Sequence, residues 1–187
     1  MKRVLLTVFL VGFLAGCGEE ADKLMQDAQA GNAQAMYDLG LRYRQKTGAL
    51  QEDLLEAEKW LEKAAAAGHG RAAYTRGRDF AREGERHLET AAAGVGIAQR
   101  YMKNDFTKAE SWYLKAAELD YPPAYAALSE LYYRGWTGAA DMKKAEEMGK
   151  MAKEKGVASA DDLLADIAKG PSQSVFGNVR SDPAGRP

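Results

Sequence analysis

A recurring helical pattern is the feature that most constrains how this chain folds. Residues 53–65 align with residues 105–117 and with residues 141–152. Each segment opens with Asp, has Ala four residues later, a large apolar residue at seven and Ala again at eleven. These spacings fall on one face of an α-helix, and an opening Asp can cap the first turn. The pattern therefore predicts three amphipathic helices, each capped by its Asp.

A second repeated segment precedes each of these helices. Residues 35–43, 72–80 and 124–132 align with one another. One shared position in them holds a small residue, namely Gly40, Gly77 and Ser129. A small side chain lets two helices pack closely, while neighbouring Tyr and Phe side chains fill the space beside it. Each pair of segments is therefore predicted to form a helix hairpin.

The ends of the hairpins repeat as well. The position after the second helix holds Gly68, Asp120 or Gly156, and Gly there favours the left-handed backbone that ends a helix. The whole pattern reads A-x-Y-x-L-G-x-x-Y followed by D-x-x-K-A-x-x-W-Y-x-K-A-A-x-x-G. It covers roughly residues 31–157 and resembles the Sel1-like repeat, a relative of the tetratricopeptide repeat. The resemblance implies an all-α fold, a right-handed solenoid of antiparallel helix hairpins, used for binding other proteins.

The middle of the chain departs from the repeat. Residues 85–94 echo residues 58–68, which predicts a compressed hairpin over residues 71–93 and a shortened helix near residues 97–103. The alternative is one long helix through this region. Three glycines oppose that alternative at about 1 kcal/mol each relative to alanine, and they are Gly84, Gly94 and Gly96.

The first residues have the three parts of a secretory signal peptide. A basic start is followed by an apolar run over residues 4–14 and by small residues before Cys17. The apolar run is shorter than the roughly 20 residues that a membrane-spanning helix needs. The sequence Leu14-Ala15-Gly16-Cys17 resembles the bacterial lipobox, which implies cleavage before Cys17 and a covalent lipid on its sulfur. An ordinary signal peptide or an uncleaved anchor is the alternative.

The lipid is expected to hold the protein at a membrane. The resemblance to lipoproteins implies two or three acyl chains, and two chains anchor a protein stably. Gly18 in place of Asp implies, by the sorting rule of Gram-negative lipoproteins, the outer membrane facing the periplasm. Cys17 is the only cysteine, so its lipidation leaves no thiol for a disulfide, a metal or catalysis.

The predicted organisation has four parts. A signal peptide over residues 1–16 precedes a lipidated N-terminus and linker over residues 17–30. The repeat domain covers residues 31–170, and a disordered tail covers residues 171–187. The last helix of the repeat domain is predicted to begin after Ser159 and to cover the open end of the solenoid.

The sequence carries no motif of a known catalytic or metal site. It has no nucleophile elbow, no zinc-protease motif and no Gly-rich phosphate loop. His69 falls in an inter-helix turn, and His87 aligns with Trp60 and Trp112, which favours packing. The net charge of −1 lacks the basic footprint of a nucleic-acid binder. We therefore predict no enzyme activity, no metal and no cofactor besides the lipid. The alternatives are a cell-envelope hydrolase of the β-lactamase kind and an inhibitor or immunity protein of a periplasmic enzyme.

Some residues that the repeat does not require are candidates for binding a protein or peptide partner. They are Arg71, Arg78, Arg82, Arg86, Tyr125, Tyr133 and Trp136. Three of the arginines repeat every four residues, so their charges repel along one helical face unless a partner or neighbouring Glu side chains offset them. Exposed aromatic and Arg side chains are common anchors of protein interfaces. Packing within the last hairpin is the alternative for the aromatic residues.

Overall fold

The structure, a computed structural model, describes residues 19–46, 48–92 and 96–170. Every regular element in these ranges is a helix, which confirms the predicted all-α fold class. The predicted signal peptide, Cys17 and the predicted tail over residues 171–187 lie outside the described residues. The chain divides into two compact units, each described here by itself: unit 1 is residues 1–72 and unit 2 is residues 73–187.

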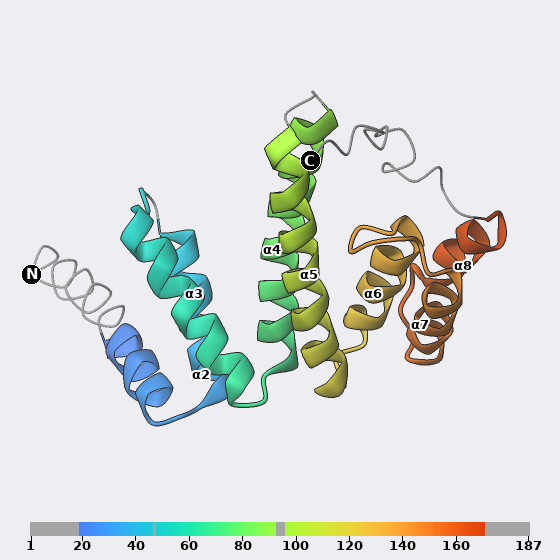
Figure 1. Cartoon of the computed structure of the whole chain (residues 1–187). Helices are drawn as coiled ribbons and strands as arrows, with labels where there is room; N and C mark the ends of the chain where they lie inside the picture. Colours follow the sequence, from blue (N-terminus) through green and yellow to red (C-terminus); the bar gives the residue numbers. More distant parts are fainter. Residues whose placement is uncertain (1–18, 47, 93–95, 171–187) are drawn as a thin grey trace, which may run out of the picture. The chain divides into compact units, whose positions relative to one another are not determined.

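Unit 1 contains a helix over residues 19–29, followed by α2 (Ala33–Gln45) and α3 (Gln51–Ala66) (Figure 1). The first helix lies in the stretch predicted as a linker. It is ordered as a helix because Ala28 is fully buried in a core that it shares with Leu39 and Trp60. A linker was expected there because the segment carries no copy of the repeat pattern.

Unit 2 is built from helices that pack mainly against their neighbours in the chain (Figure 1). They are α4 (Gly70–Ala92, which begins in unit 1), α5 (Gly96–Glu118), α6 (Pro123–Arg134), α7 (Met142–Glu154) and α8 (Ala160–Ala168). The α4–α5 and α6–α7 pairs are antiparallel hairpins, and α8 follows as the predicted last helix. The Tyr132 hydroxyl joins α6 to α5 by donating a 2.8 Å hydrogen bond to Glu110 Oε1.

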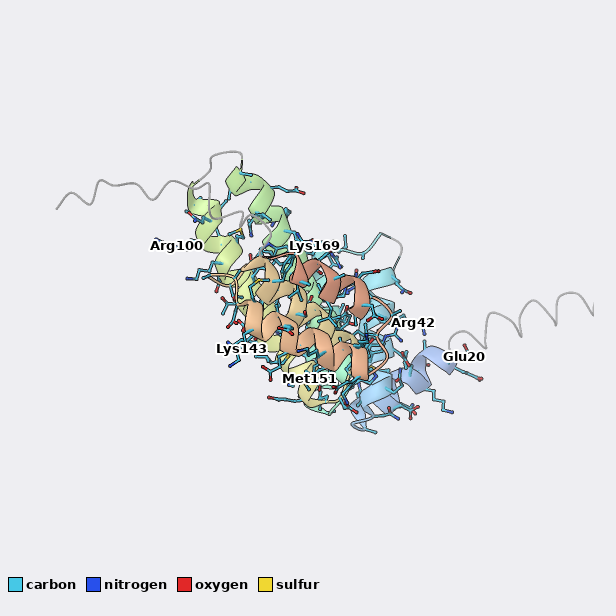
Figure 2. The ribbon with its side chains drawn as sticks, turned by 90° about the vertical axis from the view of Figure 1, so that its right-hand side faces the viewer. Glu20, Arg42, Arg100, Lys143, Met151 and Lys169 are labelled. Carbon is cyan, nitrogen blue, oxygen red and sulfur yellow. The ribbon has the colours of Figure 1, made fainter. Side chains whose placement is uncertain are left out.

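The α4–α5 hairpin contradicts the prediction for the middle of the chain. Residues 71–93 form no compressed hairpin, because α4 runs unbroken through Gly84, and α5 is one helix rather than a short one near residues 97–103. The Phe106 ring of α5 packs against Gly84, where a larger residue would not fit. A Cβ at this position would lie only 2.9 Å from Cζ of Phe106. The hairpin therefore extends beyond α6–α8 (Figure 1), and Arg100, labelled in Figure 2, lies near the start of α5 on this extension.

The predicted small residues and helix ends are confirmed. A Cβ at Gly40 would meet Leu61 Cγ at 2.9 Å, and one at Gly77 would meet the Tyr113 ring at 2.6 Å. Ser129 is fully buried and donates a 2.6 Å hydrogen bond to the Ala145 carbonyl. The helix-ending positions have positive φ, and they are Gly68 (92°), Asp120 (53°) and Gly156 (77°).

The prediction that an Asp caps each second helix holds for one helix of the three. Asp141 precedes α7 and its Oδ1 accepts a 3.0 Å hydrogen bond from the Lys144 amide. Asp53 lies inside α3, where its carboxylate accepts from the Leu50 amide at 3.0 Å. Asp105 lies in the middle of α5. Both helices therefore begin before their Asp, although Asp53 still accepts a hydrogen bond in the first turn of α3.

Candidate functional site

A groove of about 450 Å³ runs along unit 2 between α4, α6 and α8. Helix α6 buries Leu128 and Ser129 against its own hairpin, and this places Ala126 and Ala127 on the groove side. The small alanine side chains leave room for a ligand to approach the backbone of α6. The wider lining comes from Tyr74, Arg78, Tyr113, Glu130, Tyr133, Arg134, Leu163 and Asp166, with neighbouring residues of the loops.

Two tyrosines form one wall of the groove. The ring centroids of Tyr74 on α4 and Tyr113 on α5 lie 5.6 Å apart. The Tyr113 side chain is 5% exposed and packs against Gly77, yet its hydroxyl makes no hydrogen bond to any described residue. Burial raises the pKa of both hydroxyls, most strongly that of Tyr113, so both stay protonated and can donate a hydrogen bond.

The charged groups of the groove are mostly paired with each other. Arg134 Nε donates to Glu130 Oε1 at 2.9 Å on α6, and Lys169 Nζ donates to Asp166 Oδ1 at 2.7 Å beside α8. Arg78 lines the groove and is exposed, and it forms no ion pair with any residue in the described ranges. The groove therefore carries one uncompensated positive charge.

The structure separates the four predicted arginines. Arg78 reaches the groove, whereas Arg82 pairs with Asp79 at 3.7 Å. Arg86 pairs with Glu83 on the same helix. This agrees with the alternative that neighbouring Glu side chains offset the arginine charges. In unit 1, the Arg71 guanidinium lies 5.7 Å from the centroid of the Tyr37 ring.

The predicted aromatic residues also take different places. Tyr133 lines the groove and is half-buried. Tyr125 is buried, with its hydroxyl donating to the Ala117 carbonyl at 3.1 Å. Trp136 is 8% exposed and stacks on Phe106 at 4.4 Å between ring centroids. The last two were candidates for surface anchors, and the structure supports the alternative, packing in the core. Tyr125 packs with Ala152 of α7 and Ala160 of α8, and Trp136 packs with Met102 and Phe106 of α5.

Neither histidine lies in the groove. His87 Nδ1 lies 2.8 Å from Asp105 Oδ2, and this contact joins α4 to α5. His87 was predicted to pack, and the structure adds this polar contact. His69 stacks on Tyr37 with ring centroids 4.6 Å apart, and its Nδ1 accepts from the Ala72 amide at 3.1 Å. Within the described residues, no group of three or more His, Cys, Asp or Glu side chains is arranged to hold a metal ion.

A second hollow of about 820 Å³ lies in unit 1, where Met25, Leu39 and Tyr43 form part of its wall. One wall comes from the helix over residues 19–29, whose N-terminal side adjoins residues that the structure does not describe. We therefore build the candidate site on the groove of unit 2. Among the described residues, no helix is long and apolar enough to cross a membrane.

Sequence reasoning missed Tyr113 and Glu130 as site residues. The repeat alignment pointed to Trp112 as the inward residue of α5, but Trp112 is half-buried and the next residue, Tyr113, is buried. A signal was present, because the equivalent residue of α3, Leu61, is fully buried. Glu130 had no signal, since its place on the groove follows from how α6 packs against α5 and α7.

Comparisons with known proteins agree with the repeat pattern. The Sel1 repeat model matches residues 33–69, 91–121 and 122–157. A crystal structure of a Sel1 repeat protein from Oxalobacter formigenes is 31% identical, with a TM-score of 0.60, and the match covers 79% of this chain and 98% of that chain. A protective antigen present in uropathogenic Escherichia coli strains is 23% identical, with a TM-score of 0.34, over 78% of this chain and 35% of that chain. No curated protein matches.

Proposed function

Because the chain belongs to the Sel1 repeat family, we propose that it is a scaffold whose groove in unit 2 binds a segment of another protein at a membrane surface. Repeat proteins of stacked helices use such extended surfaces for binding. The observation that carries the proposal is the groove itself, whose lining on α6 includes the small side chains of Ala126 and Ala127.

The groove suits a peptide better than a folded domain. Its volume of about 450 Å³ lies within the range of small ligand sites. The lining combines alanines, aromatic rings and a few charged groups, which offers both apolar contact and hydrogen bonding to a peptide backbone. A short segment that enters the groove would bury its side chains against α4, α6 and α8.

The membrane part of the proposal rests on the N-terminal sequence. Cys17 follows an apolar run and small residues, the pattern of a lipobox, and its lipid would anchor the protein in the cell envelope. Gly18 supports the outer membrane facing the periplasm. The scaffold would then act on partners within reach of that membrane.

A crosslinking experiment tests the groove. A photo-reactive amino acid replaces Arg134, which lines the groove and is exposed, or Lys143, which is exposed on α7 (Figure 2). We expect light to join a partner to the Arg134 position and not to the Lys143 position. The captured segment, sequenced by mass spectrometry and made as a synthetic peptide, should bind the protein and compete with the crosslink. Equal capture at both positions would contradict the proposed groove.

A cysteine substitution tests the anchor. Cys17→Ser removes the sulfur that the lipid needs, so the protein should leave the membrane fraction while its helical circular dichroism and melting temperature stay unchanged. Metabolic labelling with an alkyne fatty acid should mark the original protein and not the variant. A variant that remains with the membranes, or an unlabelled original protein, would contradict the anchor.

A further inference from the structure

The Arg78 guanidinium is a positive charge at the groove without a partner among the described residues. The two acidic residues that line the groove are engaged elsewhere, since Glu130 accepts from Arg134 and Asp166 accepts from Lys169. Its neighbour one turn later on α4, Arg82, is paired with Asp79 and is not among the groove residues. A planar guanidinium in this state favours a carboxylate, which it can bind through two parallel hydrogen bonds.

The Tyr113 hydroxyl supplies a second, independent observation. Its side chain lines the groove and is more than nine-tenths buried, and its hydroxyl makes no hydrogen bond to any residue in the described ranges. Arg78 and Tyr113 both line the groove. Tyr74 lies one turn before Arg78 on α4, and its ring centroid is 5.6 Å from that of Tyr113, so Arg78 and Tyr113 lie on the same wall of the groove.

We infer that this part of the groove binds a carboxylate of a peptide, with Arg78 as the cationic partner and the Tyr113 hydroxyl as a hydrogen-bond donor. The inference rests on the proposed function, in which the groove binds a protein segment. A carboxylate only accepts hydrogen bonds, and it therefore complements two donors that lack acceptors. A single unpaired arginine beside Glu130 matches one negative charge rather than the two of a phosphate group.

The carboxylate has two possible sources, the C-terminus of the partner or an Asp or Glu side chain. An array of synthetic random-sequence peptides, each made with a free C-terminus and as the amide, separates them when probed with the labelled full chain. If the source is a C-terminus, amidation abolishes binding. If the source is a side chain, binding survives amidation and is lost when Asp and Glu are replaced by Asn and Gln.

Substitutions then test the residues, using a peptide selected from the array. Arg78→Gln should weaken binding about tenfold or more, because a hydrogen-bonded charge is lost. Arg82→Gln is the matched control on the same helix and should leave the affinity unchanged. Tyr113→Phe removes only the hydroxyl and should weaken binding by roughly two- to tenfold, with the melting temperature measured in parallel to show that packing is kept.

The outcomes separate the inference from the proposed function. If peptides compete with the groove crosslink but neither Arg78→Gln nor removal of every carboxylate changes their affinity, the inference is overturned and the proposed function stands. If no peptide in the array binds the protein, both fail. Loss of binding with Arg82→Gln equal to that with Arg78→Gln would also overturn the inference, because the effect would then come from general charge.

Discussion

The two hairpins of unit 2 are built by different means. The α6–α7 hairpin has helices of 12 and 13 residues, and its close approach uses Ser129, one of the predicted small positions. The α4–α5 hairpin has helices of 23 residues each, and its outer half packs through Gly84 and Phe106, two residues that the repeat pattern does not specify. A glycine that weakens an isolated helix can therefore be required where a ring from the next helix fills the space beside it.

The largest expected effect comes from removing that ring. Phe106 is fully buried and shares a cluster with Met102 and Trp136. Phe106→Ala should lower the free energy of unfolding by about 3–5 kcal/mol, because it leaves a cavity in the extended half of the α4–α5 hairpin. Urea unfolding measures this effect. The control is Ile97→Ala on the same helix, where the side chain is 61% exposed and the change should stay within about 0.5 kcal/mol. Similar losses for both variants would contradict the packing described for this hairpin.

A smaller effect should distinguish the glycines of the two hairpins. In an exposed helix, Gly→Ala stabilises by about 1 kcal/mol. Gly84→Ala should instead destabilise by about 1–3 kcal/mol, because its methyl group meets the rigid ring of Phe106. Gly149→Ala meets Leu164 Cδ2 at 2.8 Å, and this half-buried flexible side chain can move, so the loss should be smaller. Paired thermal melts measure both. A Gly84→Ala protein more stable than the original would show that the glycine is not a packing requirement.

The mildest expected effect concerns how the two hairpins are capped. A histidine ring takes part in capping the first turn of α4, since the Ala72 amide donates both to His69 Nδ1 at 3.1 Å and to the His69 carbonyl at 3.0 Å, whereas α7 is capped by the Asp141 carboxylate. Burial lowers the pKa of His69 below its usual 6.5, so the neutral ring is favoured in the folded protein. The unfolded chain then binds more protons in this range, and the stabilisation is complete above pH 6.5 and is lost as the pH falls below it.

Hydrogen exchange at the Ala72 amide measures this pH dependence. Exchange, corrected for its intrinsic rate, should become faster between pH 7 and pH 5. In His69→Asp, where a carboxylate replaces the ring, this acceleration should shrink. An Ala72 amide that is equally protected at both pH values in the original protein would contradict the capping role.

The fold was predictable at positions where a local requirement of a helix hairpin restricts the residue type. The spacing of Ala and aromatic residues, the small residues at Gly40 and Ser129, and the left-handed residue at Gly68 each report a local requirement of a helix hairpin. Gly84 was misinterpreted because its reason lies on another helix, in a ring that is 22 residues away in the chain.

The site was predictable only in part, for the same physical reason. Arg78 and Tyr133 were found as residues that the repeat does not require, and both line the groove. Tyr125 and Trp136 met the same criterion but are buried, because residues of α5, α7 and α8 cover Tyr125 and residues of α5 cover Trp136. Tyr113 was missed because it follows another aromatic residue, Trp112, and the sequence does not show which of the two faces the core.

Chemical-shift mapping tests whether the groove of unit 2 is the surface that binds a partner. The full chain carrying Cys17→Ser is isotope-labelled and titrated with the peptide obtained from the crosslinked partner. We expect the largest shifts on the amides of Ala126, Ala127 and Leu163, and none on the amides of Lys143 and Met151 on α7 (Figure 2). Shifts that gather on α7, or on the hollow beside Met25 in unit 1, would contradict it.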